Sequence, residues 1–259
     1  MPRWVPATHP AGGGARWDGL TASGDTRRIA PDVVAFRLSR DARLVRFGST
    51  DGLRLEGRLT VAARGRGVVL CHPHPLYGGS MLTPVILTAE QTFQDAGYTT
   101  LAFNFRGVGG SEGTHGRGRA ELADVRGALD FLQETLGPDA TDLAVVGYSF
   151  GSVVGGRAAA ADPRVTLYLG IAPPLRSQDF GFLAGARCRV ALVAGSRDHV
   201  VDAERLATLA SRPGVWFRVL DTDHFFAGAL GELATACRDA IAWARDQGAA
   251  GREHRAATG

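Results

Sequence analysis

The sequence predicts an α/β domain built on a mostly parallel, doubly wound sheet with helices on both faces. Two observations predict this architecture. Short, continuous apolar runs, typical of strands buried on both faces, alternate with longer stretches of helical period. The chain has 259 residues, which is enough to bury one full core of this kind. We assign the domain to residues 41–248, between a flexible extension (1–40) rich in Gly, Pro, Arg and Ala and a disordered tail (249–259).

The first predicted element is an antiparallel hairpin. Residues 43–47 and 53–61 alternate apolar and polar side chains on either side of Asp51-Gly52, a turn signal. Apolar runs then predict the strands 67–71, 99–103, 142–146, 165–171, 189–194 and 215–220. Helical patterns lie at 81–96, 119–136, 203–211 and 226–245. Residues 172–187 are too few to form a lid domain, so we expect an open site.

The region around Ser149 has the pattern of a strand, a sharp turn and a helix. The strand 142–146 runs directly into Gly147-Tyr148-Ser149-Phe150-Gly151, and a stretch of small residues follows. Such a G-x-S-x-G turn lifts a serine hydroxyl above the carboxyl end of the sheet, and its glycines let strand and helix approach closely. We therefore predict Ser149 as a nucleophile, with the Phe150 N–H at the helix start stabilising a developing oxyanion.

A second G-x-S-x-G match, Gly109-Gly110-Ser111-Glu112-Gly113, lacks this context. No apolar strand runs directly into it, and further glycines follow it in place of a helix start. Because the value of the motif lies in its strand–turn–helix setting, we interpret Ser111 as a loop residue.

Two further loops carry an acid and a base. Asp198 follows the strand 189–194, and His224 follows the strand 215–220. Ligands of open α/β sheets bind beyond the carboxyl ends of the strands, so these side chains are expected to meet Ser149 there. A serine hydroxyl is a poor nucleophile until a base takes its proton. His224 would take that proton, and Asp198 would hold the imidazole in place.

Two other aspartates lie close to these residues in the sequence. Asp202 is an alternative acid, but it suits the N-cap of the helix 203–211. Asp223 adjoins His224 and is interpreted as a loop or capping residue. The alternative for His224 itself is a structural role before the last helix.

The loop 72–80 is expected to supply a second oxyanion donor. It reads His72-Pro73-His74-Pro75-Leu76-Tyr77-Gly78-Gly79-Ser80. The prolines have no N–H, and we choose the N–H of Leu76, with Tyr77 and His74 as alternatives. His72 and His74 could instead form a metal pair, but no carboxylates or cysteines cluster with them, and no metal is expected.

Composition argues against several classes of protein. The net charge is +3 and the pI about 9.0, but the arginines are scattered and the chain has no lysine, so nucleic-acid binding is not expected. No apolar stretch reaches the roughly 18 residues of a membrane span. The N-terminus lacks the apolar region of a signal peptide, and three scattered cysteines fit neither a disulfide framework nor a zinc site. A cytoplasmic protein is therefore expected.

Five segments form a joint pattern that is more specific than any one of them. They are Cys71–Gly79, Phe103–Gly109, Gly147–Gly151, Ile171–Pro174 and Asp223–Phe226. Together they resemble the α/β-hydrolase superfamily, and more narrowly a bacterial subgroup of small, lidless predicted serine hydrolases. The resemblance implies the α/β-hydrolase fold, a triad of Ser149, Asp198 and His224, and no cofactor. Dienelactone-hydrolase relatives use a cysteine nucleophile, where this chain has serine.

The expected function is cleavage of a carboxylic ester or thioester through an acyl-enzyme. The partner would be a small-molecule acyl substrate, with Tyr77 and Phe225 as substrate-binding candidates, and a homodimer is also considered. Two alternatives stay open: a non-hydrolytic lyase, cyclase or acyltransferase of a biosynthetic pathway, and a binding protein that keeps only the scaffold. The identity of the substrate does not transfer with the fold.

Overall fold

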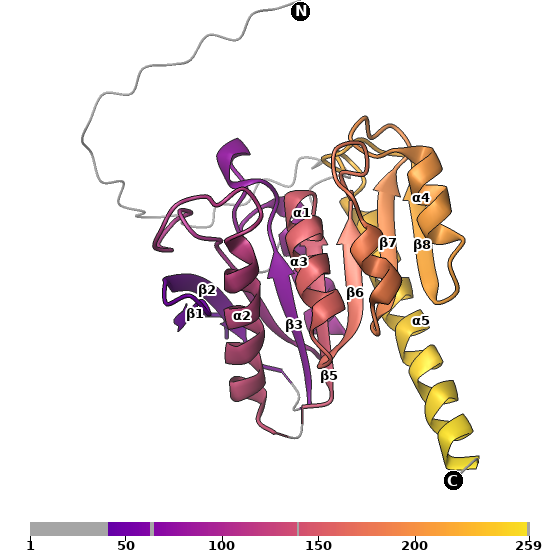
Figure 1. Ribbon diagram of the computed structural model, residues 1–259, viewed down its shortest axis with the longest axis horizontal. Coiled ribbons are helices and arrows are strands. Elements are labelled where there is room, and N and C mark those ends of the chain that lie inside the picture. Colours follow the sequence, from indigo (N-terminus) through magenta and orange to yellow (C-terminus); the bar gives the residue numbers. More distant parts are fainter. Residues whose placement is uncertain (1–40, 63–64, 139, 258–259) are drawn as a thin grey trace, which may run out of the picture. The chain divides into compact units, whose positions relative to one another are not determined.

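The computed structural model describes residues 41–62, 65–138 and 140–257, with side chains up to Gln247. The predicted extension, 1–40, lies outside the described residues. Within the described part of the chain, an eight-stranded sheet has the order β1-β2-β4-β3-β5-β6-β7-β8 (Figure 1). The predicted fold class is confirmed.

The predicted hairpin forms one end of this sheet. β1 (Arg43–Gly48) pairs antiparallel with β2 (Arg54–Thr60), and β2 pairs antiparallel with β4 (Thr99–Phe103). Gly52 in the connecting turn has a φ of 93°, which a residue without a Cβ adopts readily.

The remaining strands run parallel to β4. They are β3 (Arg66–Cys71), β5 (Asp142–Tyr148), β6 (Val165–Ile171), β7 (Arg189–Gly195) and β8 (Val215–Leu220). The chain goes from β3 outward to β4 and then returns to β5 on the other side of β3. This reversal makes the carboxyl ends of β3 and β5 the point at which a ligand site is expected.

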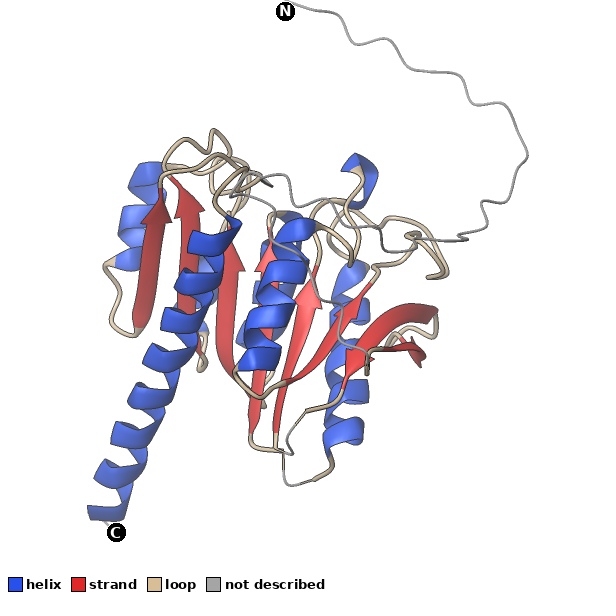
Figure 2. Cartoon of the chain, turned by 180° about the vertical axis from the view of Figure 1, so that it is seen from behind, coloured by secondary structure: helices blue, strands red, loops and turns tan. Residues whose placement is uncertain are grey.

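The helices cover the two faces of the sheet unequally. One face carries α2 (Glu121–Leu136), α3 (Phe150–Ala161) and α4 (Ala203–Ala210), and the other carries α1 (Pro84–Asp95) and α5 (Leu230–Ala257) (Figures 1 and 2). Each face has its own cluster of buried apolar side chains. Two short 3₁₀ helices lie in loops that follow the carboxyl ends of β3 and β6: η1 (Pro75–Tyr77) and η2 (Gly181–Gly185). No described helix has the length and apolar character needed to cross a membrane.

The tail beyond residue 248 departs from the prediction. We expected disorder in 249–259, but α5 continues as far as Ala257. Alanine, arginine and glutamate, all good helix formers, make up most of this segment, and no proline interrupts it. Those preferences outweigh the cost of its glycines.

Candidate active site

Ser149 lies on the turn between β5 and α3. Its backbone has φ 52° and ψ −116°, which residues other than glycine rarely adopt. A Cβ on Gly147 would lie 2.3 Å from the carbonyl oxygen of Gly151, and a Cβ on Gly151 would lie 2.1 Å from that of Cys71. Only glycine fits at both positions, and the close approach of the backbones holds the Ser149 hydroxyl above the sheet.

Three predicted side chains from three loops meet at this turn. Nε2 of His224, which follows β8, lies 3.0 Å from Oγ of Ser149. Nδ1 of the same ring lies 2.7 Å from Oδ2 of the buried Asp198, which follows β7. The other oxygen of that carboxylate accepts the N–H of Val200 at 2.8 Å, and the Tyr148 hydroxyl donates to the His224 carbonyl at 2.9 Å. An imidazole held in this way can take a proton from the serine while the carboxylate stabilises the imidazolium.

The competing residues have structural roles. Asp202 caps α4 by accepting the N–H of Arg205 at 3.0 Å, and Asp223 accepts the N–H of Phe225 at 3.0 Å. Ser111 lies in a loop, as predicted, and its buried hydroxyl donates to the carbonyl of Asn104 at 2.6 Å. None of the three takes part in the hydrogen-bond chain that ends at Ser149.

The N–H of Leu76, our choice for the second oxyanion donor, already has an acceptor within the loop. His74 caps η1, and its Nδ1 accepts the Leu76 N–H at 3.2 Å. Tyr77 was the first alternative donor, and its N–H is engaged too, because it donates to the His74 carbonyl at 3.1 Å. The N–H of His74 and that of Phe150, at the start of α3, have no protein acceptor among the described residues. Of the candidates in the loop, His74 therefore has the free N–H.

His72 ties the ends of β3 and β4 together. It is fully buried, its Nε2 accepts the Phe105 N–H at 3.0 Å, and its Nδ1 lies 2.6 Å from the carbonyl oxygen of Pro73. Burial lowers the pKa of His72 to about 4 and keeps the ring neutral. With both nitrogens engaged, this ring has no lone pair for a metal. Among the described residues, no three His, Cys, Asp or Glu side chains are placed to hold one.

An aromatic cluster that sequence reasoning missed packs beside the two free N–H groups. The rings of His74 and Phe150 have centroids 5.0 Å apart, and His115 lies 4.8 Å from the first and 5.4 Å from the second. Nδ1 of His115 is 2.8 Å from the buried carboxylate of Glu121, which also accepts the N–H of Gly116 at 2.7 Å. Burial, and then neighbouring His115, lowers the pKa of His74. The Gly116-Arg-Gly-Arg-Ala-Glu121 stretch is the one sequence signal that could have indicated a carboxylate-bound loop.

The two substrate-binding candidates stand at the rim. Tyr77 on η1 is 87% exposed and packs against His74, with ring centroids 4.7 Å apart. Phe225 is 72% exposed, and its ring lies 5.6 Å from that of His224. Both neighbours belong to the site, and the role of the two rim residues in binding substrate stays a prediction.

Comparison with known proteins places the chain in a family. Residues 74–166 match the family described as alpha/beta hydrolase fold. A solved structure from Agrobacterium tumefaciens, an α/β hydrolase of unknown function, is 33% identical, with 77% of this chain and 94% of that chain covered at a TM-score of 0.71. This chain belongs to the α/β hydrolases. A hydrolase from Xanthomonas campestris, a serine hydrolase without a lid, is 27% identical, with 79% and 95% of the two chains covered and a TM-score of 0.69.

This α/β hydrolase also has a curated relative with a named activity. It is similar to a thiohydrolase from Aspergillus aculeatus, at 30% identity over 134 residues. The match covers 50% of this chain and 41% of that relative. The expected resemblance to lidless members of the family is confirmed, while the reaction itself is a matter for proposal.

Proposed function

We propose that this α/β hydrolase cleaves a carboxylic ester or thioester through an acyl-enzyme on Ser149. The observation that carries the proposal is the unbroken chain from the Asp198 carboxylate through His224 to Oγ of Ser149, with heavy-atom distances of 2.7 and 3.0 Å. Both distances are within the range in which a base removes the proton of a nucleophile.

In the proposed reaction, His224 takes the proton of Ser149 as Oγ attacks the acyl carbon. The tetrahedral intermediate collapses as His224 returns that proton to the leaving alcohol or thiol. Water, activated in the same way, then releases the acid and restores the serine. Asp198 does not change protonation; it keeps the Nδ1–H of the imidazole in place and stabilises the imidazolium.

The proposed oxyanion hole consists of the N–H groups of Phe150 and His74. Support comes from their lack of acceptors among the described residues, from the position of Phe150 at the N-terminus of α3, and from the packing of the two rings. Donors fixed before the reaction stabilise the developing oxyanion with little reorganisation.

The proposed substrate is a small or medium-sized acyl compound. Only a short segment, with the 3₁₀ turn η2, connects β6 to β7, and the rim residues Tyr77 and Phe225 are exposed. Such a site can bind short acyl groups between apolar walls without an opening step. The similarity to a thiohydrolase makes thioesters a class to test beside oxygen esters.

Covalent labelling tests the nucleophile. A fluorophosphonate probe should modify Ser149 of the wild-type protein, as mapped by mass spectrometry, and should not label Ser149→Ala. That variant should lose about 10⁴-fold or more of the activity on p-nitrophenyl butyrate. Ser196→Ala, an exposed serine on the loop after β7, is the control and should retain both properties. Labelling at Ser111, or a labelled Ser149→Ala, would contradict the proposal.

Substrate series test the class of acyl compound. Turnover of p-nitrophenyl esters should decrease from butyrate to palmitate, without a jump above the solubility limit. The S-butyryl thioester of N-acetylcysteamine should be compared with the matched oxygen ester. A preference for long chains would contradict an open site, and EDTA should leave all rates unchanged.

A further inference from the structure

β8 leaves one row of backbone groups open at the end of the sheet. It pairs with β7 and with no other described strand. The carbonyl of Leu220 accepts the Ser196 N–H at 2.8 Å, so the residue at this position points its backbone groups toward β7. Because direction alternates along a strand, the N–H and C=O groups of Phe217 and Val219 point away from β7. Within the described chain they have no partner strand.

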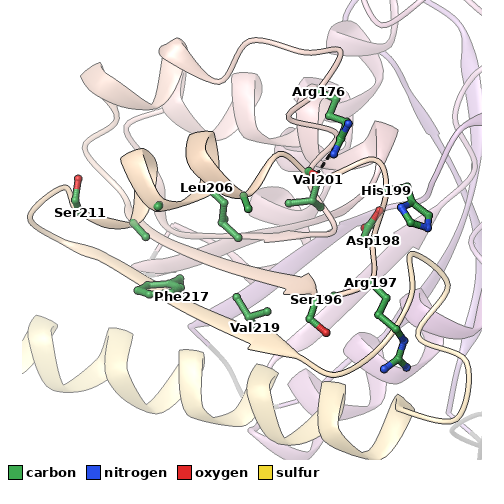
Figure 3. Close-up of a pocket in the computed structure, with 14 residues that line it drawn as sticks. Arg176, Ser196, Arg197, Asp198, His199, Val201, Leu206, Ser211, Phe217 and Val219 are labelled. Carbon is green, nitrogen blue, oxygen red and sulfur yellow. Dashed lines mark hydrogen bonds between the residues drawn. The ribbon is translucent and has the colours of Figure 1, made fainter.

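Two apolar side chains on this edge are largely uncovered. Phe217 is 49% exposed and Val219 45%, whereas strands of parallel sheets are ordinarily buried on both faces. They line a groove of about 570 Å³ between β8 and α4 (Figure 3). The α4 side of the groove is made by Ala203, Leu206, Ala207 and Ala210. The alanines are too short to cover the strand, so the groove stays open.

We propose that two copies of this chain pair through β8, antiparallel, about a two-fold axis at Phe217. A row of free N–H and C=O groups at strand spacing is satisfied best by another strand. A second copy offers the same row, and a two-fold contact requires a self-complementary surface. The residues whose backbone groups point away from β7 are Val215, Phe217 and Val219. All three are apolar, so each copy would cover the exposed side chains of the other.

The pairing of Arg218 favours one register. With Phe217 opposite Phe217 of the second copy, each Phe217 N–H would donate to the Phe217 carbonyl across the axis, and each Val219 N–H to the Val215 carbonyl. Arg218 would then lie opposite Trp216 of the second copy, repeating a contact that these two side chains already make within the chain at 5.5 Å. The register shifted by one residue pair places Arg218 opposite itself, and like charges directly opposite are destabilising.

Sedimentation velocity on the full chain tests the dimer. Interfaces of one strand and one helix per copy are at the small end of specific contacts, so we expect a dissociation constant on the order of 10 µM. The mass should rise from 27.3 kDa toward twice that value between about 1 and 300 µM protein. Phe217→Glu should raise the dissociation constant at least tenfold, because it places two carboxylates at the axis.

Leu44→Glu is the matched control. Leu44 is 74% exposed on β1, the strand at the other edge of the sheet, and its replacement should leave the mass unchanged. Thermal melts of both variants show whether they are folded. A chain that stays monomeric at about 300 µM would overturn the proposal. A dimer that Leu44→Glu dissolves and Phe217→Glu does not would overturn it as well.

Cross-linking tests the register. The native thiols Cys71, Cys188 and Cys237 are buried, so an added cysteine reacts alone. Phe217→Cys should form a covalent dimer with a bismaleimide of about 8 Å, because directly opposite side chains are about 5 Å apart. Val219→Cys should not, since the two copies of that residue would be about 14 Å apart along the strands. The reverse result, or cross-linking of Arg218→Cys alone, would exclude this register.

Discussion

The turn at Ser149 and the loop 72–80 both follow central strands, but they are held in place by different kinds of contact. The turn is fixed by backbone against backbone, since Gly147 and Gly151 leave no room for a Cβ. Within the loop, Gly79 also lies against the Pro73 carbonyl, but side chains join the loop to the rest of the site: His72 bonds to the end of β4, and His74 packs against Phe150. Contacts of the first kind leave a signature in the sequence, and contacts of the second kind do not.

The largest expected effect is the loss of activity when the base that serves Ser149 is replaced. His224→Gln should lower kcat/KM by about 10⁴-fold, and adding Ser149→Ala should lower it little further, because the two residues act as one unit. Ester hydrolysis by the purified variants measures both. His199→Gln, an exposed histidine next to Asp198, is the control and should keep near-normal activity. Activity above a tenth of wild type in His224→Gln would show that another base serves Ser149.

Gly151→Ala tests whether the turn is fixed by backbone contact. The added Cβ would meet the Cys71 carbonyl oxygen at 2.1 Å, so the variant should lose about 4 kcal/mol or more of unfolding free energy, or fail to fold. Gly231→Ala, with nothing within 4 Å of the new Cβ, should be neutral or slightly stabilising. Urea unfolding followed by circular dichroism compares them. Equal stability of the two variants would show that the turn relaxes easily.

The pH dependence of stability tests the side-chain contacts of the loop. The pKa of His72 is about 4 in the fold against an ordinary value of 6.5, so the unfolded chain binds its proton at higher pH than the native one. Stability from this group is present above pH 6.5 and is lost as the pH falls to about 4, by roughly 3 kcal/mol. In urea unfolding at the two pH values, the decrease should be smaller in His72→Gln by that amount. An equal decrease would show that His72 takes its proton without opening the fold.

The smallest expected effect concerns His115. His115→Ala should lower kcat about tenfold with KM nearly unchanged, since its ring packs against the rings of the two residues that carry the proposed oxyanion donors. His115→Phe keeps the ring contacts and should restore most of the rate. Inhibition by a boronic acid, which mimics the tetrahedral intermediate, should weaken by the same factor as kcat/KM. A change confined to KM would assign His115 to substrate binding instead.

Most of the fold could be predicted because period and turn chemistry are local signals. The run 99–103 coincides with β4 and 215–220 with β8. The predicted helix starts at 81 and 226 are wrong, and each true start depends on a single residue. Helix α1 begins at Pro84, which suits the first turn of a helix. Helix α5 begins only after Phe226, whose φ is 56°.

Some residues of the candidate site could be predicted from the sequence, and others could not. Ser149, Asp198 and His224 could be placed near one another because each follows a strand of one parallel sheet. Leu76 could not be excluded, because its N–H is engaged only through the orientation of the His74 ring. His115 could not be found either: its loop has no period, and the buried carboxylate of Glu121 shapes it through the N–H groups of two glycines.

The order of the strands gives the three side chains of the site unequal protection from local unfolding. Ser149 follows β5 in the middle of the sheet, whereas His224 follows β8, which has a single neighbour among the described strands. Segments with few buried contacts open at lower free energy than the global transition. Opening of β8 alone would withdraw the imidazole while β3, β5 and β6 stay folded. On heating, inactivation should therefore precede the loss of secondary structure, and amide exchange in β8 should be faster than in β3, β5 and β6.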